Sequence, residues 1–183
     1  MKTRWLTAAV MVAAIGLAPA VTFAQAPDKS KVPSGDKKFV TEAAEGNLAE
    51  VELGKLASEK AANDAVKQFG QRMVGDHGKA NEELAKLAQD KGVSTPSGLD
   101  SKHQKLRDRL AKLSGAAFDR AYVDEMVKDH RQDVKEFQRE ADKGKDPDVK
   151  AWAAKTLPTL QDHLKQVENI QTQMKGAAKT EKK

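Results

Sequence analysis

Apolar residues recur every three or four positions along most of the chain, which is the period of an amphipathic α-helix. The pattern predicts four long helices, at residues 37–61, 64–90, 116–142 and 147–174. No segment shows the alternation of apolar and polar residues that is typical of a half-buried strand. We therefore expect an all-α domain.

The connections between these helices predict how the helices are arranged. The first two helices, and likewise the last two, are separated by only a few residues, as in helical hairpins. The middle connection carries Pro96, Gly98 and a shorter predicted helix at residues 101–113, with Asp100 as its N-cap. It is much longer than the ~2–8 residues that join neighbouring helices of a bundle. The sequence therefore predicts a ferritin-like four-helix bundle of two hairpins, with a long middle crossover that contains the short helix.

The N-terminus departs from this amphipathic pattern. Lys2 and Arg4 precede an apolar run at residues 5–20, and the small residues of "TFAQA" follow. This is the pattern of a secretory signal peptide, and Ala24 is the best place for cleavage. An uncleaved N-terminal membrane anchor is the alternative, although a membrane span needs about 20 apolar residues. We therefore expect an exported, periplasmic protein.

Composition divides the chain into further segments and excludes some classes of binding partner. The predicted segments are a signal peptide (1–24), a linker rich in Pro, Ser and Gly (25–36), the bundle (37–175) and a basic, disordered tail (176–183). The formal charge is +5 with no basic stripe interleaved with aromatics, so we do not expect nucleic-acid binding. Cysteine is absent, which excludes disulfides and thiolate metal sites. Peripheral association with the cell envelope is compatible with this composition, and the sequence does not indicate an oligomeric state.

Histidine is rare in the chain but its positions are patterned. Three of the four histidines follow an aspartate, in the pairs Asp76-His77, Asp129-His130 and Asp162-His163. At about 100° per residue, each of these histidines lies in the centre of the apolar stripe of its own helix. The first helix has no histidine, and Glu50 is the carboxylate on its apolar side. All four residues lie near the midpoints of their helices, and midpoints share one layer in a bundle of antiparallel hairpins.

One carboxylate and three imidazoles in one layer suit zinc, iron or manganese, and copper is a further option. We therefore predict that Glu50, His77, His130 and His163 are ligands of a transition metal. A metal-free network of Glu–His hydrogen bonds, or histidines that only fill the core, fit the same pattern. His103 illustrates the second alternative, because it lies on the apolar stripe of the short helix, which we expect outside the bundle. The preceding aspartates are interpreted as a solvated helix face or as partners of a histidine on a neighbouring helix.

Four stretches carry a family resemblance: "FVTEAAEGNLAEVELGKLASEKA", "VKQFGQRMVGDHGKANEELAKLA", "GAAFDRAYVDEMVKDHRQDVKEF" and "KTLPTLQDH". With the signal peptide, they resemble an exported bacterial family, domain-of-unknown-function family 4142, over residues 38–167. Its members are often labelled membrane or outer-membrane proteins. The resemblance implies a ferritin-like four-helix fold and no established activity. It also places Glu50, His77, His130 and His163 at pattern positions of the family.

The chain departs from the wider ferritin-like superfamily at one informative point. Di-iron members carry a Glu-x-x-His motif on two helices. Here Val74 stands three residues before His77, and Leu160 stands three residues before His163. This departure favours a single mononuclear site over a carboxylate-bridged di-iron site.

Three functional hypotheses follow from these residues. The leading hypothesis is an exported protein with a metal-binding or metal-responsive role. The second is a non-catalytic stress or envelope-interaction protein whose polar layer is purely structural. The third is a metallo-oxidoreductase, which we place last because no acid–base pair or nucleophile with a specific spacing appears elsewhere.

Overall fold

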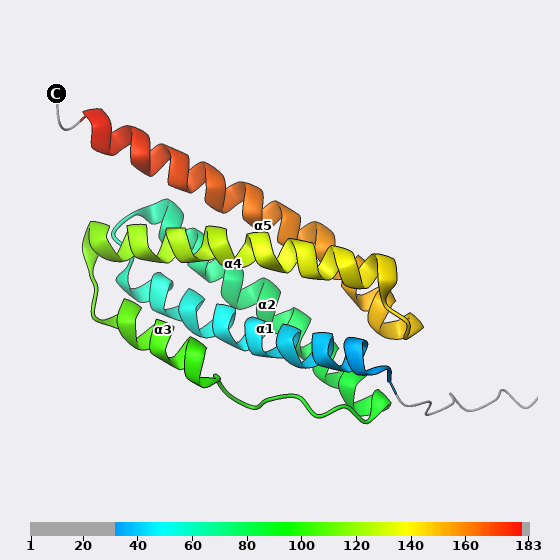
Figure 1. Ribbon diagram of the computed structural model, residues 1–183. Helices are drawn as coiled ribbons and strands as arrows, with labels where there is room; N and C mark the ends of the chain where they lie inside the picture. The colour runs from blue at the N-terminus through cyan, green and yellow to red at the C-terminus, as the bar shows by residue number, and fades with distance from the viewer. Residues whose placement is uncertain (1–31, 181–183) are drawn as a thin grey trace, which may run out of the picture.

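The computed structural model describes residues 32–180 and contains five α-helices (Figure 1). They are α1 (Ser34–Lys60), α2 (Asp64–Lys91), α3 (Ser101–Ala111), α4 (Gly115–Lys143) and α5 (Pro147–Thr180). No strand occurs within the described residues, so the prediction of an all-α domain is confirmed. The predicted signal peptide and the alternative anchor lie outside these residues. Among the helices that are described, none has the length and apolar character to cross a bilayer.

The helix ends follow local sequence signals. The side chain of Asn63 accepts hydrogen bonds from the backbone N–H groups at the start of α2, and Asp100 does the same for α3. Gly92 ends α2 in the left-handed conformation, at φ 66°, which glycine adopts without strain. Two ends differ from the sequence-based bounds. α1 begins at Ser34, within the predicted linker, and α5 continues to Thr180, within the predicted tail.

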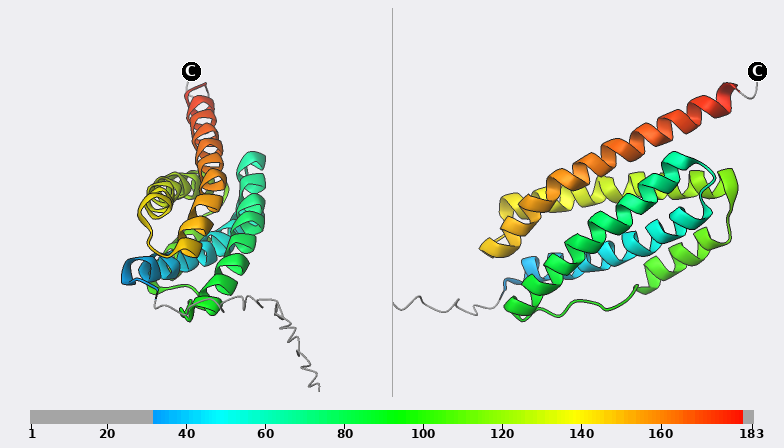
Figure 2. Two further views of the ribbon diagram at one scale, coloured as in Figure 1. Left: turned by 90° about the vertical axis from the view of Figure 1, so that its right-hand side faces the viewer. Right: turned by 180° about the vertical axis from the view of Figure 1, so that it is seen from behind.

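The long helices pack as two pairs, with α2 running back along α1 and α5 running back along α4 (Figures 1 and 2). α2 also contacts α5, and α1 contacts α4. The segment between α2 and α4, which includes α3, runs the length of the bundle (Figure 1). Our expectation that the short helix lies outside the bundle is wrong, because α3 contacts α1 and α4 and buries Leu106 and Leu110.

Two helix backbones approach closely at Gly54 on α1 and Gly70 on α2. A Cβ atom built on Gly54 would lie 2.6 Å from the carbonyl oxygen of Gly70. A Cβ atom on Gly70 would lie 2.8 Å from the Gly54 carbonyl oxygen and 2.7 Å from the Cβ of Ala57. Only glycine leaves room for this contact, and the contact holds α1 close to the helix that carries His77.

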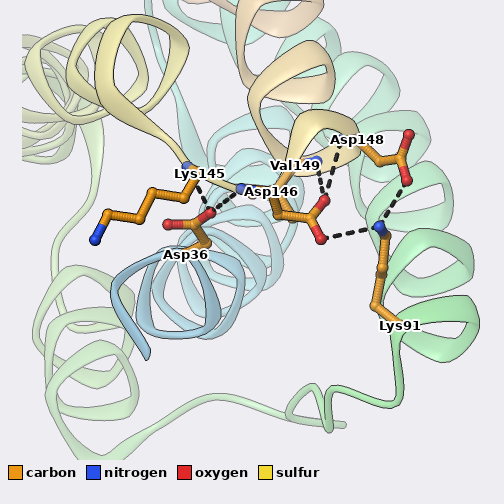
Figure 3. Close-up of polar contacts among 6 residues, drawn as sticks. All are labelled: Asp36, Lys91, Lys145, Asp146, Asp148 and Val149. Atoms are coloured by element: carbon orange, nitrogen blue, oxygen red, sulfur yellow. Dashed lines mark hydrogen bonds and ion pairs between the residues drawn. The ribbon is translucent and has the colours of Figure 1, made fainter. Parts of the chain in front are cut away.

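Buried aspartates fix the heights of the helices relative to one another. At one end, the carboxylate of Asp36 on α1 accepts hydrogen bonds from the backbone N–H groups of Lys145 and Asp146 (Figure 3). Asp146 in turn accepts from the N–H of Val149 at the start of α5 and pairs with Lys91 at the end of α2, at 2.9 Å (Figure 3). These contacts join α1 and α2 to the turn between α4 and α5.

A corresponding contact fixes the other end of the bundle. The carboxylate of Asp119 on α4 accepts from the backbone N–H groups of Ala62 and Asn63, at 3.1 and 2.9 Å, in the turn between α1 and α2. Each turn is therefore held by an aspartate of the opposite helix pair. Because both ends are fixed in this way, the helix midpoints are brought to the same level.

A layer of buried polar residues divides the apolar core into two clusters. On α2, Phe69 and Met73 belong to one cluster and Leu84 to the other, and His77 lies between them. On α5, Leu160 and Val167 are divided in the same way around His163. The residues of the polar layer are Asn47, Glu50, His77, His130 and His163, all of them buried.

Candidate metal centre

Three histidines from three helices meet in this layer. His77 on α2 is 3% exposed, and His130 on α4 and His163 on α5 are 0% exposed. The ring centroids form a nearly equilateral triangle, with sides of 5.6 Å between His77 and His130, 5.3 Å between His77 and His163, and 5.4 Å between His130 and His163. One ring nitrogen from each lies within 4.8 Å of the other two. The structure therefore brings together three of the four residues that the sequence singles out.

Hydrogen bonds fix the tautomers of the first two rings. Nδ1 of His77 lies 2.9 Å from Oδ1 of Asn47, and Nδ1 of His130 lies 3.0 Å from the backbone carbonyl of Met126. Both oxygens can only accept, so each Nδ1 carries the proton and donates. In both rings the Nε2 atom is left with its lone pair, which is the form that binds a metal.

The third ring is held by the opposite nitrogen. Nε2 of His163 donates to a carboxylate oxygen of Asp76 at 2.8 Å, which leaves the lone pair on Nδ1. Asp76 also accepts from Arg72 at 3.1 Å, and Arg72 pairs with Asp162 at 2.8 Å. Asp76 is thus the partner of a histidine on a neighbouring helix. Asp162 belongs to the charged residues at the surface around Asp76. For Asp162, the interpretation as part of a solvated helix face therefore fits.

Three ring nitrogens, Nε2 of His77, Nε2 of His130 and Nδ1 of His163, are buried and have no hydrogen-bond partner among the described residues. Leaving a buried acceptor unsatisfied costs about 1–3 kcal/mol. One metal ion would satisfy all three at once, since imidazole nitrogens coordinate at about 2.0–2.1 Å. The donor set therefore fits a metal ion.

The electrostatics of the layer keep the rings neutral. Burial lowers the pKa of His130 from 6.5 to about 4, with a further contribution from His163. Burial likewise holds the pKa of His77 well below its ordinary value, and it lowers the pKa of His163 in spite of the nearby Asp76 carboxylate. Neutral imidazoles do not have to lose a proton before they bind a cation.

Glu50 lies beside the triangle and is not part of the group of three nitrogens. It is 3% exposed, and its Oε1 atom is 3.7 Å from Nδ1 of His130, the nitrogen that already donates to Met126. Its Oε2 atom is buried without a hydrogen-bond partner. Burial raises the pKa of the Glu50 carboxyl well above its ordinary value, and the carboxylates of Asp133 and Asp129 add to this effect.

A cleft connects the centre with the surface between α2 and α5. It has a volume of about 150 Å³, and both His77 and His163 line it. Thr156 and Thr159 lie along it, and Leu160 gives it an apolar side. On another side of the triangle, the ring of Phe69 packs 6.1 Å from His130 and 6.3 Å from His163. The centre is therefore enclosed by core residues but has a route for an ion or a small ligand.

Sequence reasoning missed three groups that hold the rings in place. Asn47 lies three residues before Glu50, on the same side of its helix, and this position in the sequence could have indicated that its side chain is buried near the histidines. Arg72 orients Asp76 from one helical turn away. The carbonyl of Met126 is a backbone group and has no signal in the sequence. The Asn47 contact joins α1 to α2 and so depends on how these helices are rotated against one another, whereas the contacts of Arg72 with Asp76 and of Met126 with His130 lie within α2 and α4.

The fold and the site define a helical-bundle protein with a buried centre of three histidines that can hold a metal ion. The chain belongs to the DUF4142 family, a domain of unknown function, whose family model matches residues 20–170. The comparison with curated proteins gives no match.

The chain is also similar in fold to several solved structures. A DUF305 fragment from Deinococcus radiodurans is 12% identical, with a TM-score of 0.68, and the match covers 79% of this chain and 99% of that one. CopM in its Cu(II)-bound form is 17% identical, with a TM-score of 0.64 and coverage of 75% and 96%. A DUF305 protein from Streptomyces coelicolor is 11% identical, with a TM-score of 0.65 and coverage of 76% and 92%. At these identities the similarity shows the fold alone.

Proposed function

We propose that this protein is an exported, ferritin-like bundle of two helical hairpins that binds one transition-metal ion. The ligands are Nε2 of His77, Nε2 of His130 and Nδ1 of His163. The observation that carries the proposal is the convergence of three buried ring nitrogens without partners, in rings whose other nitrogen is already engaged. A histidine that only fills the core is not expected to leave a ring nitrogen unpaired next to two other histidines.

The donor set favours copper or zinc over manganese. Imidazole suits zinc, copper and iron, whereas manganese prefers carboxylate and water ligands. Among divalent first-row metals, copper binds nitrogen sites most tightly. The structural similarity to CopM in its Cu(II)-bound form supports copper as the first ion to test. Iron in a carboxylate-bridged pair is disfavoured because the layer holds one carboxylate, Glu50, beside three imidazoles.

Glu50 was expected to be the fourth ligand, and we propose that it stays outside the coordination sphere. Its nearest ring nitrogen is Nδ1 of His130, which faces Met126 and not the inward triangle. His77 and His163 line the cleft between α2 and α5, so water or an exogenous ligand can reach the ion from there. A Glu50→Gln variant should therefore keep its metal.

The role that fits this centre is metal binding. A bound ion would supply Lewis acidity or electron transfer. Among the described residues that line the cleft, Asp76 is engaged with His163 and Lys155 with Glu83. The chain's residues hold and enclose the ion: Asn47, Met126 and Asp76 orient the rings, and Phe69 excludes water from one side. A purely structural polar layer is the competing account, and the same experiment separates the two.

The test is elemental analysis of the protein purified from the periplasm, with titration of the metal-stripped protein by Cu(II) and Zn(II). We expect about one ion per chain, because three imidazoles form a single site. The variants His77→Ala and His130→Ala should lose the ion, and His103→Ala, whose ring lies on α3, should keep it. Sub-stoichiometric metal that is the same in all four proteins would overturn the proposal. In that case the alanine variants should change stability alone.

A further inference from the structure

A second cleft lies between α1, the start of α3 and α4. Its volume is about 240 Å³, and none of the residues that line it also lines the cleft beside His77 and His163. Seven of its lining residues are acidic, and Lys102 is the one lysine or arginine among the described residues that line it. His103 also lines the cleft, where its Nδ1 lies 3.0 Å from Oδ2 of Asp100. The cleft therefore holds a large excess of carboxylates over cationic groups.

Glu50 gives a second observation that points to a ligand. It lines this cleft, it is 3% exposed, and its Oε2 atom is buried without a partner. Asp129 and Asp133 line the same cleft from α4 and form no side-chain hydrogen bond or ion pair with any described residue. An ionised carboxylate that is buried without a partner is costly, and either a proton or a bound cation relieves that cost.

The chemistry of the cleft differs from that of the histidine triangle. Carboxylate oxygens and water are the ligands that hard cations such as Ca²⁺ and Mg²⁺ prefer, whereas imidazoles select transition metals. A cleft of about 240 Å³ has room for an ion and several water molecules. Carboxylates that are too far apart for a bare ion can bind a cation that keeps part of its hydration shell.

We propose that this acidic cleft is a second cation site, which takes a hydrated hard divalent cation through Glu50, Asp129 and Asp133. The site does not depend on the proposed transition-metal site, since the two clefts have no lining residue in common. In this account Glu50 separates the two centres: one carboxylate oxygen lies beside His130 and the other is available to the cation.

The experiment is calorimetric titration of the metal-stripped full chain with CaCl₂ at low ionic strength, repeated with MgCl₂ as competitor. We expect about one Ca²⁺ per chain, with a dissociation constant of the order of 10⁻⁴–10⁻³ M, the range of weak Ca²⁺ sites in extracellular modules. Asp133→Asn and Asp129→Asn should each weaken binding by about tenfold or more, since each removes one charged ligand. Glu59→Gln is the matched control, because Glu59 is exposed on α1 outside the cleft and loses the same charge.

Thermal unfolding with and without CaCl₂ gives a second readout that does not depend on the heat of binding. The wild type, Glu59→Gln and His77→Ala should gain stability with Ca²⁺, and Asp133→Asn should not. Absence of Ca²⁺ binding, or equal binding by Asp133→Asn and Glu59→Gln, would overturn the proposal. Loss of copper in His77→Ala with Ca²⁺ binding intact would show that the two sites are separate.

Discussion

The carboxylate of Asp76 on α2 accepts a 2.8 Å hydrogen bond from Nε2 of His163 on α5. This contact joins the two helix pairs at the level of the histidine triangle. It also leaves Nδ1 of His163, with its lone pair, without a hydrogen-bond partner in the cluster that this ring forms with His77 and His130. Because a carboxylate raises the basicity of the ring that it accepts from, Asp76 should strengthen metal binding without touching the ion.

The first prediction concerns this contact. Asp76→Asn keeps an oxygen that can accept from His163 but removes the charge, and loss of such a partner typically costs about 10–100-fold in metal affinity. We therefore expect a Cu(II) or Zn(II) dissociation constant weakened by about that factor, measured by competition with a chelator. Asp162→Asn is the control, because Asp162 pairs with the same Arg72 and forms no hydrogen bond or ion pair with a histidine ring of the described residues. Equal affinities of the two variants would contradict this role for Asp76.

The second prediction concerns helix packing. Gly70→Ala places a methyl group 2.7 Å from the Cβ of Ala57 and 2.8 Å from the Gly54 carbonyl oxygen, so α1 and α2 must separate. We expect the free energy of unfolding to fall by about 1–3 kcal/mol. Gly75→Ala, on the exposed side of the same helix with nothing within 4 Å of the new Cβ, should raise it by about 1 kcal/mol. Urea denaturation of the metal-free chains measures both, and equal effects would rule out the close approach.

A third prediction concerns the pKa of Asp133. Burial raises this pKa from 3.8 to about 7; the nearby carboxylates of Asp129 and Glu136 also raise it, and Lys102 lowers it. Between about pH 4 and pH 7 the folded state binds a proton that the unfolded state has lost, so stability falls as pH rises across that window. The protonated Asp133 side chain makes its full contribution to the free energy of unfolding below about pH 4, and this contribution is lost above about pH 7.

Asp133→Asn has no such proton to lose. Without divalent cations, its stability should therefore exceed that of the wild type by an amount that grows across this window. Asp133 is partly exposed, so solvent screening reduces the expected gain to about 1–2 kcal/mol at pH 8. Denaturant titrations at several pH values measure the difference, and Glu59→Gln serves as the control. A difference that does not change with pH would show that the pKa of Asp133 is the same in the folded and unfolded states.

The helices and the convergence of the three histidines were accessible from the sequence for a physical reason. Burial on one face of a helix leaves a period of three to four residues, and His77, His130 and His163 each stand in the middle of such a stripe. Short connections then bring helix midpoints to one level. The spacing of the residues therefore predicts both the side of the helix on which each histidine lies and its level along the bundle.

The hydrogen-bond partners that the rings find on neighbouring helices were harder to predict from the sequence, because these contacts depend on the rotation of each helix about its axis. A rotation of a few tens of degrees decides whether Asp76 faces His163 or the solvent, and whether Glu50 faces the triangle or the acidic cleft. Apolar periodicity tolerates such rotations, since an apolar stripe is about 100° wide. For the same reason the burial of α3 through Leu106 and Leu110 could not be inferred from its short pattern alone.

The most direct test of the proposed centre is X-ray absorption spectroscopy of the Cu(II)-loaded full chain, compared with the triple variant His77→Ala/His130→Ala/His163→Ala. We predict three imidazole nitrogens at about 2.0 Å from the ion in the wild type, and loss of the imidazole scattering together with the bound copper in the variant. Copper that is retained by the triple variant, or held by oxygen ligands in the wild type, would contradict the assignment of the three histidines as its ligands.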